Sequence, residues 1–299
     1  MTKLTYTATF GSYFDPSSIN ATVQGWERPA GLTENPRVGM RALFFLQTNG
    51  PHLGVVAFRG TDLNTSTESG RCDRCADERM WHTSRDRDLD CRGFSNATLD
   101  YFARARDFVR RVRQRYPDVD ILFTGHSLGA GLAGALAAVT PPPPSTSSSG
   151  GVPPSFSVAV TFASPAWVRF LARRLPAVPL PSSPAAHARL YALADEWDPV
   201  QRESMATADG LRGTQCLWSS PEPLTCKVCY ASGALNMSSP ACLGCFEQRH
   251  IYAHYLHVDA PGPRASCKPI PTRTAISVAA GDVNAAGRTG APVLRASLV

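Results

Sequence analysis

A short glycine-flanked serine motif, Gly125-His-Ser-Leu-Gly129, constrains the fold of this chain more than any other feature. An apolar run at residues 119–124 precedes the motif, and small apolar residues occupy most of positions 130–139 after it. This order predicts a buried strand, a tight turn and a helix, because the glycines let strand and helix approach without a Cβ clash. We therefore expect Ser127 to be exposed at the carboxyl edge of a mostly parallel sheet, beside the N-terminus of the helix.

The rest of the chain alternates between apolar, strand-like runs and helical patterns. An α/β-hydrolase fold is the predicted class, with a mostly parallel central sheet flanked by helices. A single domain is expected over residues 1–275, followed by a poorly ordered tail at 276–299. Further predicted segments are a strand pair within 41–59, a functional loop or mobile lid at 62–92, an amphipathic helix at 97–115, a Pro-rich insertion at 141–154, strands at 156–162 and 188–194, a helix at 167–175 and a Cys-rich, irregular segment at 216–267.

Composition argues against several other classes of protein. Hydrophobic residues make up 43% of the 299 residues, which is enough to bury a core. The formal net charge is +6, but the densest basic run, at 104–115, falls on the predicted amphipathic helix, where a solvated face is the simpler interpretation. We therefore expect no nucleic-acid partner. No stretch reaches the ~18 apolar residues that a membrane span needs, and we expect neither a metal nor another cofactor at the serine site.

A serine hydroxyl becomes a good nucleophile when a base accepts its proton and an acid orients that base. In this fold class the three residues follow the order serine, acid, histidine. His126, inside the serine motif, is expected to pack there. The residues that fit the second and third places are the acids Asp195, Glu196 and Asp198, near a predicted strand end, and the histidines His250, His254 and His257.

Five segments share a pattern with one enzyme family. They are Val55-Val-Ala-Phe-Arg-Gly-Thr61, Gly93-Phe94, Ile121-Leu-Phe-Thr-Gly-His-Ser-Leu-Gly129, Thr161-Phe-Ala-Ser-Pro165 and Leu190-Tyr-Ala-Leu-Ala-Asp-Glu-Trp-Asp-Pro-Val200. Together they resemble the class-three lipases, the fungal triacylglycerol lipase type. The similarity covers residues 40–200, and the stretch around Ser127 is its most specific part.

The resemblance implies a role for particular residues. The acid directly before the Pro-Val pair, Asp198, takes the place of the catalytic acid. His254, followed by Tyr-Leu and later by Cys267, takes the place of the base, with His250 as its rival and His257 as a third choice. The oxyanion hole is expected to use the backbone N–H groups of Leu128 and Thr61.

The activity implied by the resemblance is that of a lipase or carboxylesterase, which hydrolyses acyl esters of glycerolipids through an acyl-enzyme intermediate. Its partner would be a lipid ester at a membrane or lipid-droplet surface. A phospholipase or a galactolipase with the same triad is a second possibility. A third, of a different class, is an inactive scaffold whose Cys-rich module binds zinc.

The nine cysteines leave two interpretations open. Cys226-x2-Cys229 and Cys242-x2-Cys245 have a spacing typical of zinc ribbons, but disulfides fit them as well. Disulfides are favoured by four glycosylation sequons, which begin at Asn20, Asn64, Asn96 and Asn236 and suggest a secretory or extracytoplasmic compartment. The N-terminus, however, lacks the apolar core of a signal peptide. In either case the cysteines are expected to fix the loop that carries His250 and His254.

Overall fold

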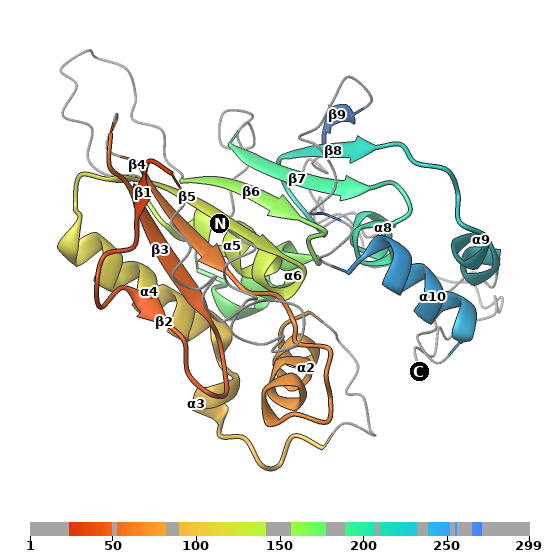
Figure 1. Cartoon of the computed structure of the whole chain (residues 1–299), viewed down its shortest axis with the longest axis horizontal. Helices are drawn as coiled ribbons and strands as arrows, with labels where there is room; N and C mark the ends of the chain where they lie inside the picture. Colours follow the sequence, from red (N-terminus) through yellow and green to blue (C-terminus); the bar gives the residue numbers. More distant parts are fainter. Residues whose placement is uncertain are drawn as a thin grey trace, which may run out of the picture.

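A mostly parallel β-sheet runs through the molecule, with helices packed beside it (Figure 1). The structure is a computed structural model, and it describes residues 24–49, 53–81, 90–141, 157–177, 189–206, 210–231, 239–251, 255 and 265–270. Within these residues the sheet has nine strands in the order β1-β3-β4-β5-β6-β7-β8-β9, and β2 pairs with β3. Their bounds are β1 Trp26–Glu27, β2 Thr33–Glu34, β3 Ala42–Gln47, β4 Leu53–Phe58, β5 Asp120–His126, β6 Val158–Phe162, β7 Leu190–Asp195, β8 Thr214–Trp218 and β9 Ala265–Pro269.

The five strands from β4 to β8 are parallel, and this sets the place of the candidate site. Each pairs with the next in the same direction, whereas β1, β2, β3 and β9 are antiparallel to their partners. Phe58 lies opposite Gly125, and His126 lies opposite Phe162. Segments that follow these strands therefore leave the sheet at one edge. The predicted α/β-hydrolase architecture is confirmed by this strand order and by the strand–turn–helix at Ser127.

The main core lies between one face of the sheet and the helices α2, α4, α5 and α6 (Figure 1). Nearly all of α5 is buried, which matches a helix that is apolar on every side. Smaller clusters around Phe45 and Trp218 lie outside this core. The helices are α2 Glu68–Trp81, α3 Asn96–Leu99, α4 Tyr101–Arg115, α5 Leu128–Val139, α6 Trp167–Arg174, α8 Pro199–Ala206, α9 Leu224–Ala231 and α10 Pro240–Arg249.

Two predicted segments differ from the structure for identifiable reasons. The polar stretch at 62–92 contains α2, which sequence analysis missed because the buried face of this helix includes charged and small residues such as Asp73 and Gly70. The single helix predicted at 97–115 is divided at Asp100. The side chain of Asp100 accepts a hydrogen bond from the N–H of Ala103 and so caps α4.

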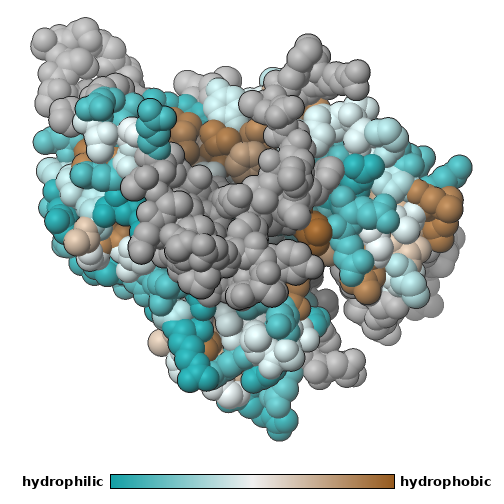
Figure 2. All heavy atoms as spheres, in the orientation of Figure 1, coloured by the Kyte–Doolittle hydropathy of each residue, from teal (hydrophilic) through white to brown (hydrophobic). Residues whose placement is uncertain are grey.

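The Cys-rich segment is not irregular, because it contains α9 and α10. Two disulfides, Cys226–Cys245 and Cys229–Cys242, join these helices into a hairpin, and two more pair Cys75 with Cys91 and Cys216 with Cys267. The remaining cysteine, Cys72, is buried and free. Hydrophobic side chains are visible at the outer side of this hairpin (Figure 2), where Leu224, Val228 and Leu243 are exposed.

Several predictions fall on residues that the structure does not describe. They include almost all of the insertion at 141–154, the whole tail at 276–299, and His254 and His257. Among the helices in the described ranges, none combines the length and apolar character that crossing a membrane requires.

Gly129→Ala should destabilise the protein, because a Cβ at this position would lie 2.4 Å from the carbonyl oxygen of Phe58. Overpacking of this kind costs about 1–3 kcal/mol. Chemical denaturation of both proteins measures the difference in the free energy of unfolding. Gly93→Ala is the matched control, since its Cβ would meet nothing within 4 Å. Equal losses in the two variants would contradict the close packing of strand and helix described above.

Candidate active site

Ser127 lies at the turn between β5 and α5, in a backbone conformation that few residues adopt. Its φ and ψ angles are 54° and −125°, a region in which non-glycine residues are strained. The turn is possible because its flanking residues lack side chains: a Cβ on Gly125 would lie 2.4 Å from backbone atoms of Gly129. The N–H of Ser127 donates to the carbonyl of Phe162 on the neighbouring strand, at 3.0 Å. The sheet and the helix together therefore fix the direction of the serine side chain.

The side chains of Ser127, His250 and Asp198 form a continuous hydrogen-bonded chain. His250 Nε2 lies 2.8 Å from Ser127 Oγ, and His250 Nδ1 lies 3.0 Å from Asp198 Oδ2. His250 and Asp198 are buried, at 2% and 0% exposed. An ionised carboxylate only accepts hydrogen bonds, so Nδ1 carries the proton and Nε2 is free to accept the hydroxyl proton of Ser127.

The histidine beside Ser127 is His250, the rival of the favoured His254. His250 directly follows α10, and its N–H caps that helix by donating to the carbonyl of Phe246 at 2.8 Å. The resemblance pointed to His254 because of the Tyr-Leu pair after it, but that residue lies outside the described ranges. The signal that could have favoured His250 was its position close to the cysteine pair of α10, which holds that helix.

Asp198 accepts hydrogen bonds from three donors. The first donor is the imidazole of His250, the rival to the favoured His254, and the second is the backbone N–H of Gln201, which donates to Oδ1 at 2.9 Å. The third donor is the hydroxyl of Tyr255, 2.5 Å from Oδ2. Burial, followed by the neighbouring Asp198 carboxylate, raises the pKa of Tyr255 well above its usual value, so this hydroxyl keeps its proton. Nothing in the sequence pattern marked Tyr255.

His126 connects the turn at Ser127 to the histidine segment. It is buried, as expected, but it also has a polar role: its Nε2–H donates to the backbone carbonyl of His250 at 2.7 Å. The two imidazole rings lie 5.0 Å apart, centre to centre. The residue before Ser127 thus holds the backbone of the residue that contacts Ser127.

The two residues expected in the oxyanion hole lie at the same edge of the sheet. Leu128 begins α5, and the first N–H groups of a helix have no acceptor within it. Thr61 follows β4, and its hydroxyl donates to the carboxyl group of Asp77 on α2. Since β4 and β5 are adjacent and parallel, the segments that follow them, which carry Thr61 and Ser127, leave the sheet at the same edge. Sequence analysis missed Asp77 together with its helix.

A buried ion pair supports the segment that carries Thr61. Arg59 pairs with Asp73, and the same carboxylate accepts hydrogen bonds from the hydroxyl of Tyr101 at 2.5 Å and the N–H of Asp62 at 2.8 Å. These contacts fix residues on both sides of Thr61. A rigid backbone here is what an oxyanion-hole donor needs, since such donors act by being held in place before the reaction.

The structure decides between zinc and disulfides in favour of disulfides. Cys226, Cys229, Cys242 and Cys245 are all paired, so the zinc interpretation is wrong for these four residues. Across the described part of the chain, no group of three or more His, Cys, Asp or Glu side chains could hold a metal ion.

Part of the chain matches a known protein family. Residues 55–169 match the family model for lipase (class 3). Over this segment the chain is similar to the class 3 lipases. The matched segment runs from β4 to α6 and includes the Ser127 turn, so the resemblance found in the sequence is confirmed there. Among curated proteins, none matches the chain.

Solved lipase structures are similar to this chain at low sequence identity. A lipase from Rhizopus microsporus var. chinensis has 16% identity and a TM-score of 0.38, and the match covers 72% of this chain and 69% of that one. The nonglycosylated LIP2 lipase of Yarrowia lipolytica has 16% identity and a TM-score of 0.41, and the match covers 74% of this chain and 77% of that one. The native propeptide complex of Rhizomucor miehei lipase has 17% identity and a TM-score of 0.40, and the match covers 74% of this chain and 69% of that one.

Asp77→Asn should change how stability depends on pH. Burial raises the pKa of Asp77 to about 7, and the hydrogen bond from Thr61 opposes this shift. The folded protein thus holds a proton that the unfolded chain, with its carboxyl pKa near ~4, has released. The contribution of Asp77 to stability is therefore present at low pH and is lost as pH rises toward about 7.

Denaturation of wild type and Asp77→Asn across this pH range tests the prediction. Wild type should lose stability relative to the variant as pH rises, while Glu68→Gln, an exposed change on the same helix, should follow wild type. Parallel curves for wild type and Asp77→Asn would show that Asp77 does not titrate in this way.

Proposed function

We propose that this protein is a serine hydrolase that cleaves acyl ester bonds of glycerolipids, with Ser127 as its nucleophile. The observation that carries the proposal is the 2.8 Å contact between Ser127 Oγ and His250 Nε2, on an imidazole whose other nitrogen bonds Asp198. His250 takes the role of base that the sequence favoured for His254. Asp198, Thr61 and Leu128 keep the roles expected of them.

In this mechanism His250 accepts the hydroxyl proton as Ser127 Oγ bonds to the carbonyl carbon of the ester. Asp198 stabilises the imidazolium that forms and keeps Nδ1 protonated. The N–H groups of Leu128 and Thr61 donate to the oxyanion of the tetrahedral intermediate. His250 then gives the proton to the departing alcohol, and an acyl group remains on Ser127. Water, activated by His250, releases the fatty acid and restores the serine.

The class 3 lipase match supports a lipid ester as the substrate. Such a substrate would be met at a membrane or lipid-droplet surface. A phospholipase or a galactolipase would use the same three residues, so the head group is decided by comparing substrates. We expect faster fatty-acid release from a triacylglycerol emulsion than from phosphatidylcholine or monogalactosyldiacylglycerol vesicles. Fatty-acid release from phosphatidylcholine alone, or from monogalactosyldiacylglycerol alone, would show that the substrate is that polar lipid and not triacylglycerol. The proposed mechanism would be unchanged.

Four disulfides support an oxidising compartment, such as the secretory pathway. Two of the sequons, at Asn64 and Asn96, lie on exposed residues. Both observations fit a glycosylated protein.

His250→Ala and His254→Ala distinguish the two candidate bases. With p-nitrophenyl butyrate as substrate, His250→Ala should lower kcat by about 10³-fold or more, as should Ser127→Ala, since a triad acts as a unit. His254→Ala, four residues along the chain, should keep most of the wild-type kcat. The reverse order of the two histidine variants would restore His254 as the base and contradict the proposal.

A further inference from the structure

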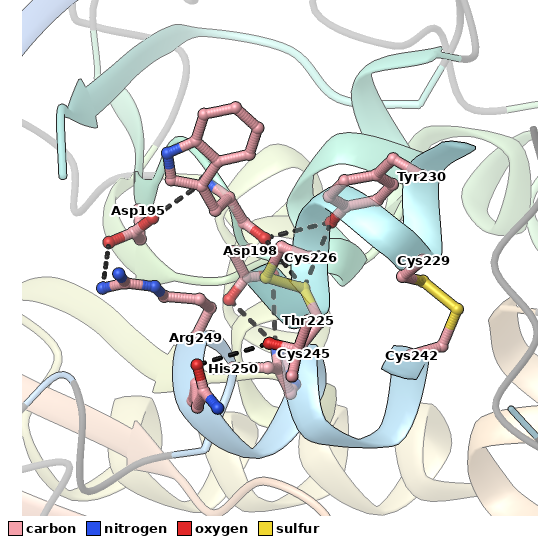
Figure 3. The surroundings of a disulfide bond; sticks show 12 residues. Asp195, Asp198, Thr225, Cys226, Cys229, Tyr230, Cys242, Cys245, Arg249 and His250 are labelled. Carbon is pink, nitrogen blue, oxygen red and sulfur yellow. Dashed lines mark hydrogen bonds and ion pairs between the residues drawn. A yellow bond between two sulfur atoms is a disulfide. The ribbon is translucent and has the colours of Figure 1, made fainter. Parts of the chain in front are cut away.

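The candidate base lies at the end of a disulfide-linked helical hairpin outside the sheet (Figure 3). The hairpin consists of α9 and α10, joined by Cys226–Cys245 and Cys229–Cys242. All four cysteines are at most 1% exposed. Helices of 8 and 10 residues are too short to be stable alone in water. The position of α10, and of the histidine after it, therefore depends on the disulfides and on the contacts of the hairpin.

One side of the hairpin contacts the segment that carries the acid. The four cysteines pack together with Trp197 and Tyr230. The hydroxyl of Tyr230 donates to the backbone carbonyl of Trp197 at 3.0 Å, and Cys245 Sγ lies 3.8 Å from the same oxygen. Because Trp197 directly precedes Asp198, these contacts fix the backbone from which the acid extends.

The end of the hairpin contacts the same segment a second time. Arg249, the last residue of α10, lies 3.5 Å from the buried carboxylate of Asp195 and donates to the carbonyl of Pro221 at 2.8 Å. Asp195 in turn accepts the N–H of Asp198 at its backbone carbonyl, at 3.0 Å. The hairpin thus contacts the 195–198 turn at Asp195 and at Trp197, and the next residue after Arg249 is His250.

We propose that the α9–α10 hairpin is a positioning element that sets the distance between the His250 imidazole and the Asp198 carboxylate, with Tyr230 and the Cys226–Cys245 disulfide as its positioning residues. This rests on the proposed function, since it deepens the account of the same triad. Two different parts of the molecule hold the two sides of the His250 imidazole. The sheet, through Ser127 and His126, holds His250 toward the nucleophile. The hairpin, through Tyr230 and Arg249, holds the segment that carries Asp198 beside His250.

Loosening the hairpin should therefore affect catalysis more than substrate binding. The His250–Asp198 contact matters most in the transition state, when the imidazole becomes charged, so its loss lowers kcat and leaves KM nearly unchanged. A small displacement of the imidazole is enough to lower kcat measurably, because misplacement of a catalytic group by about 1 Å can cost a factor of 10² in rate.

The test uses two variants of the full chain, Tyr230→Phe and the double variant Cys226→Ser/Cys245→Ser. We expect kcat for p-nitrophenyl butyrate to fall about threefold or more in the first and about tenfold or more in the second, with KM within about twofold of wild type. In both, the downfield proton NMR resonance of His250 Nδ1–H, bonded to Asp198, should broaden or disappear.

Matched controls separate positioning from general stability. Tyr116→Phe removes a hydroxyl from a ring that packs on Phe44, in the main core, and should retain kcat. Cys216→Ser/Cys267→Ser removes the disulfide between β8 and β9, and should lower the melting temperature with a smaller change in kcat than the hairpin variant. If the hairpin double variant does not fold, Tyr230→Phe alone tests whether the hairpin positions His250.

The outcomes also separate this proposal from the proposed function. Wild-type kcat and an intact downfield resonance in Tyr230→Phe, or in a folded hairpin double variant, would overturn the positioning role. An inactive wild type would contradict the proposed function instead, and the NMR resonance would still report whether the hairpin holds His250 against Asp198.

Discussion

The hydrogen bond between Ser127 and His250 is the interaction on which the account depends, because it joins two parts of the molecule that are built differently. The serine belongs to the parallel sheet and its buried helix, and the histidine belongs to a disulfide-linked hairpin. Neither part alone contains both side chains. The 2.8 Å contact exists only because the strand order and the hairpin bring both residues to one edge of the sheet.

Each part uses a different physical means to hold its residue in place. The serine is fixed by close packing, since the glycines beside it leave no room for side chains between strand and helix. The histidine is fixed by covalent links and by polar contacts with the acid segment. His126 connects the two, because it ends β5 directly before Ser127 and donates a hydrogen bond to the backbone carbonyl of His250. This arrangement explains how a short helical hairpin can carry a residue that needs accurate placement.

The sequence predicted what depends on local patterns. The Ser127 turn and the parallel strands around it agree with the structure, because apolar runs and glycine spacing are local signals. The structure also places Asp198, the acid chosen from the sequence, 3.0 Å from His250. Contacts between distant residues could not be read in this way. Asp77 lies on α2, a helix whose polar sequence gave no helical signal. Tyr255, which donates to Asp198, belongs to no recognisable sequence motif. The choice between His250 and His254 depended on where α10 ends.

The most direct test of the central claim is to label the protein with a fluorophosphonate and map the adduct by mass spectrometry. The account predicts one phosphonylated residue, Ser127, and a labelling rate that falls sharply in His250→Ala because the hydroxyl has lost its proton acceptor. An adduct on another residue, or equal labelling rates in wild type and His250→Ala, would contradict it.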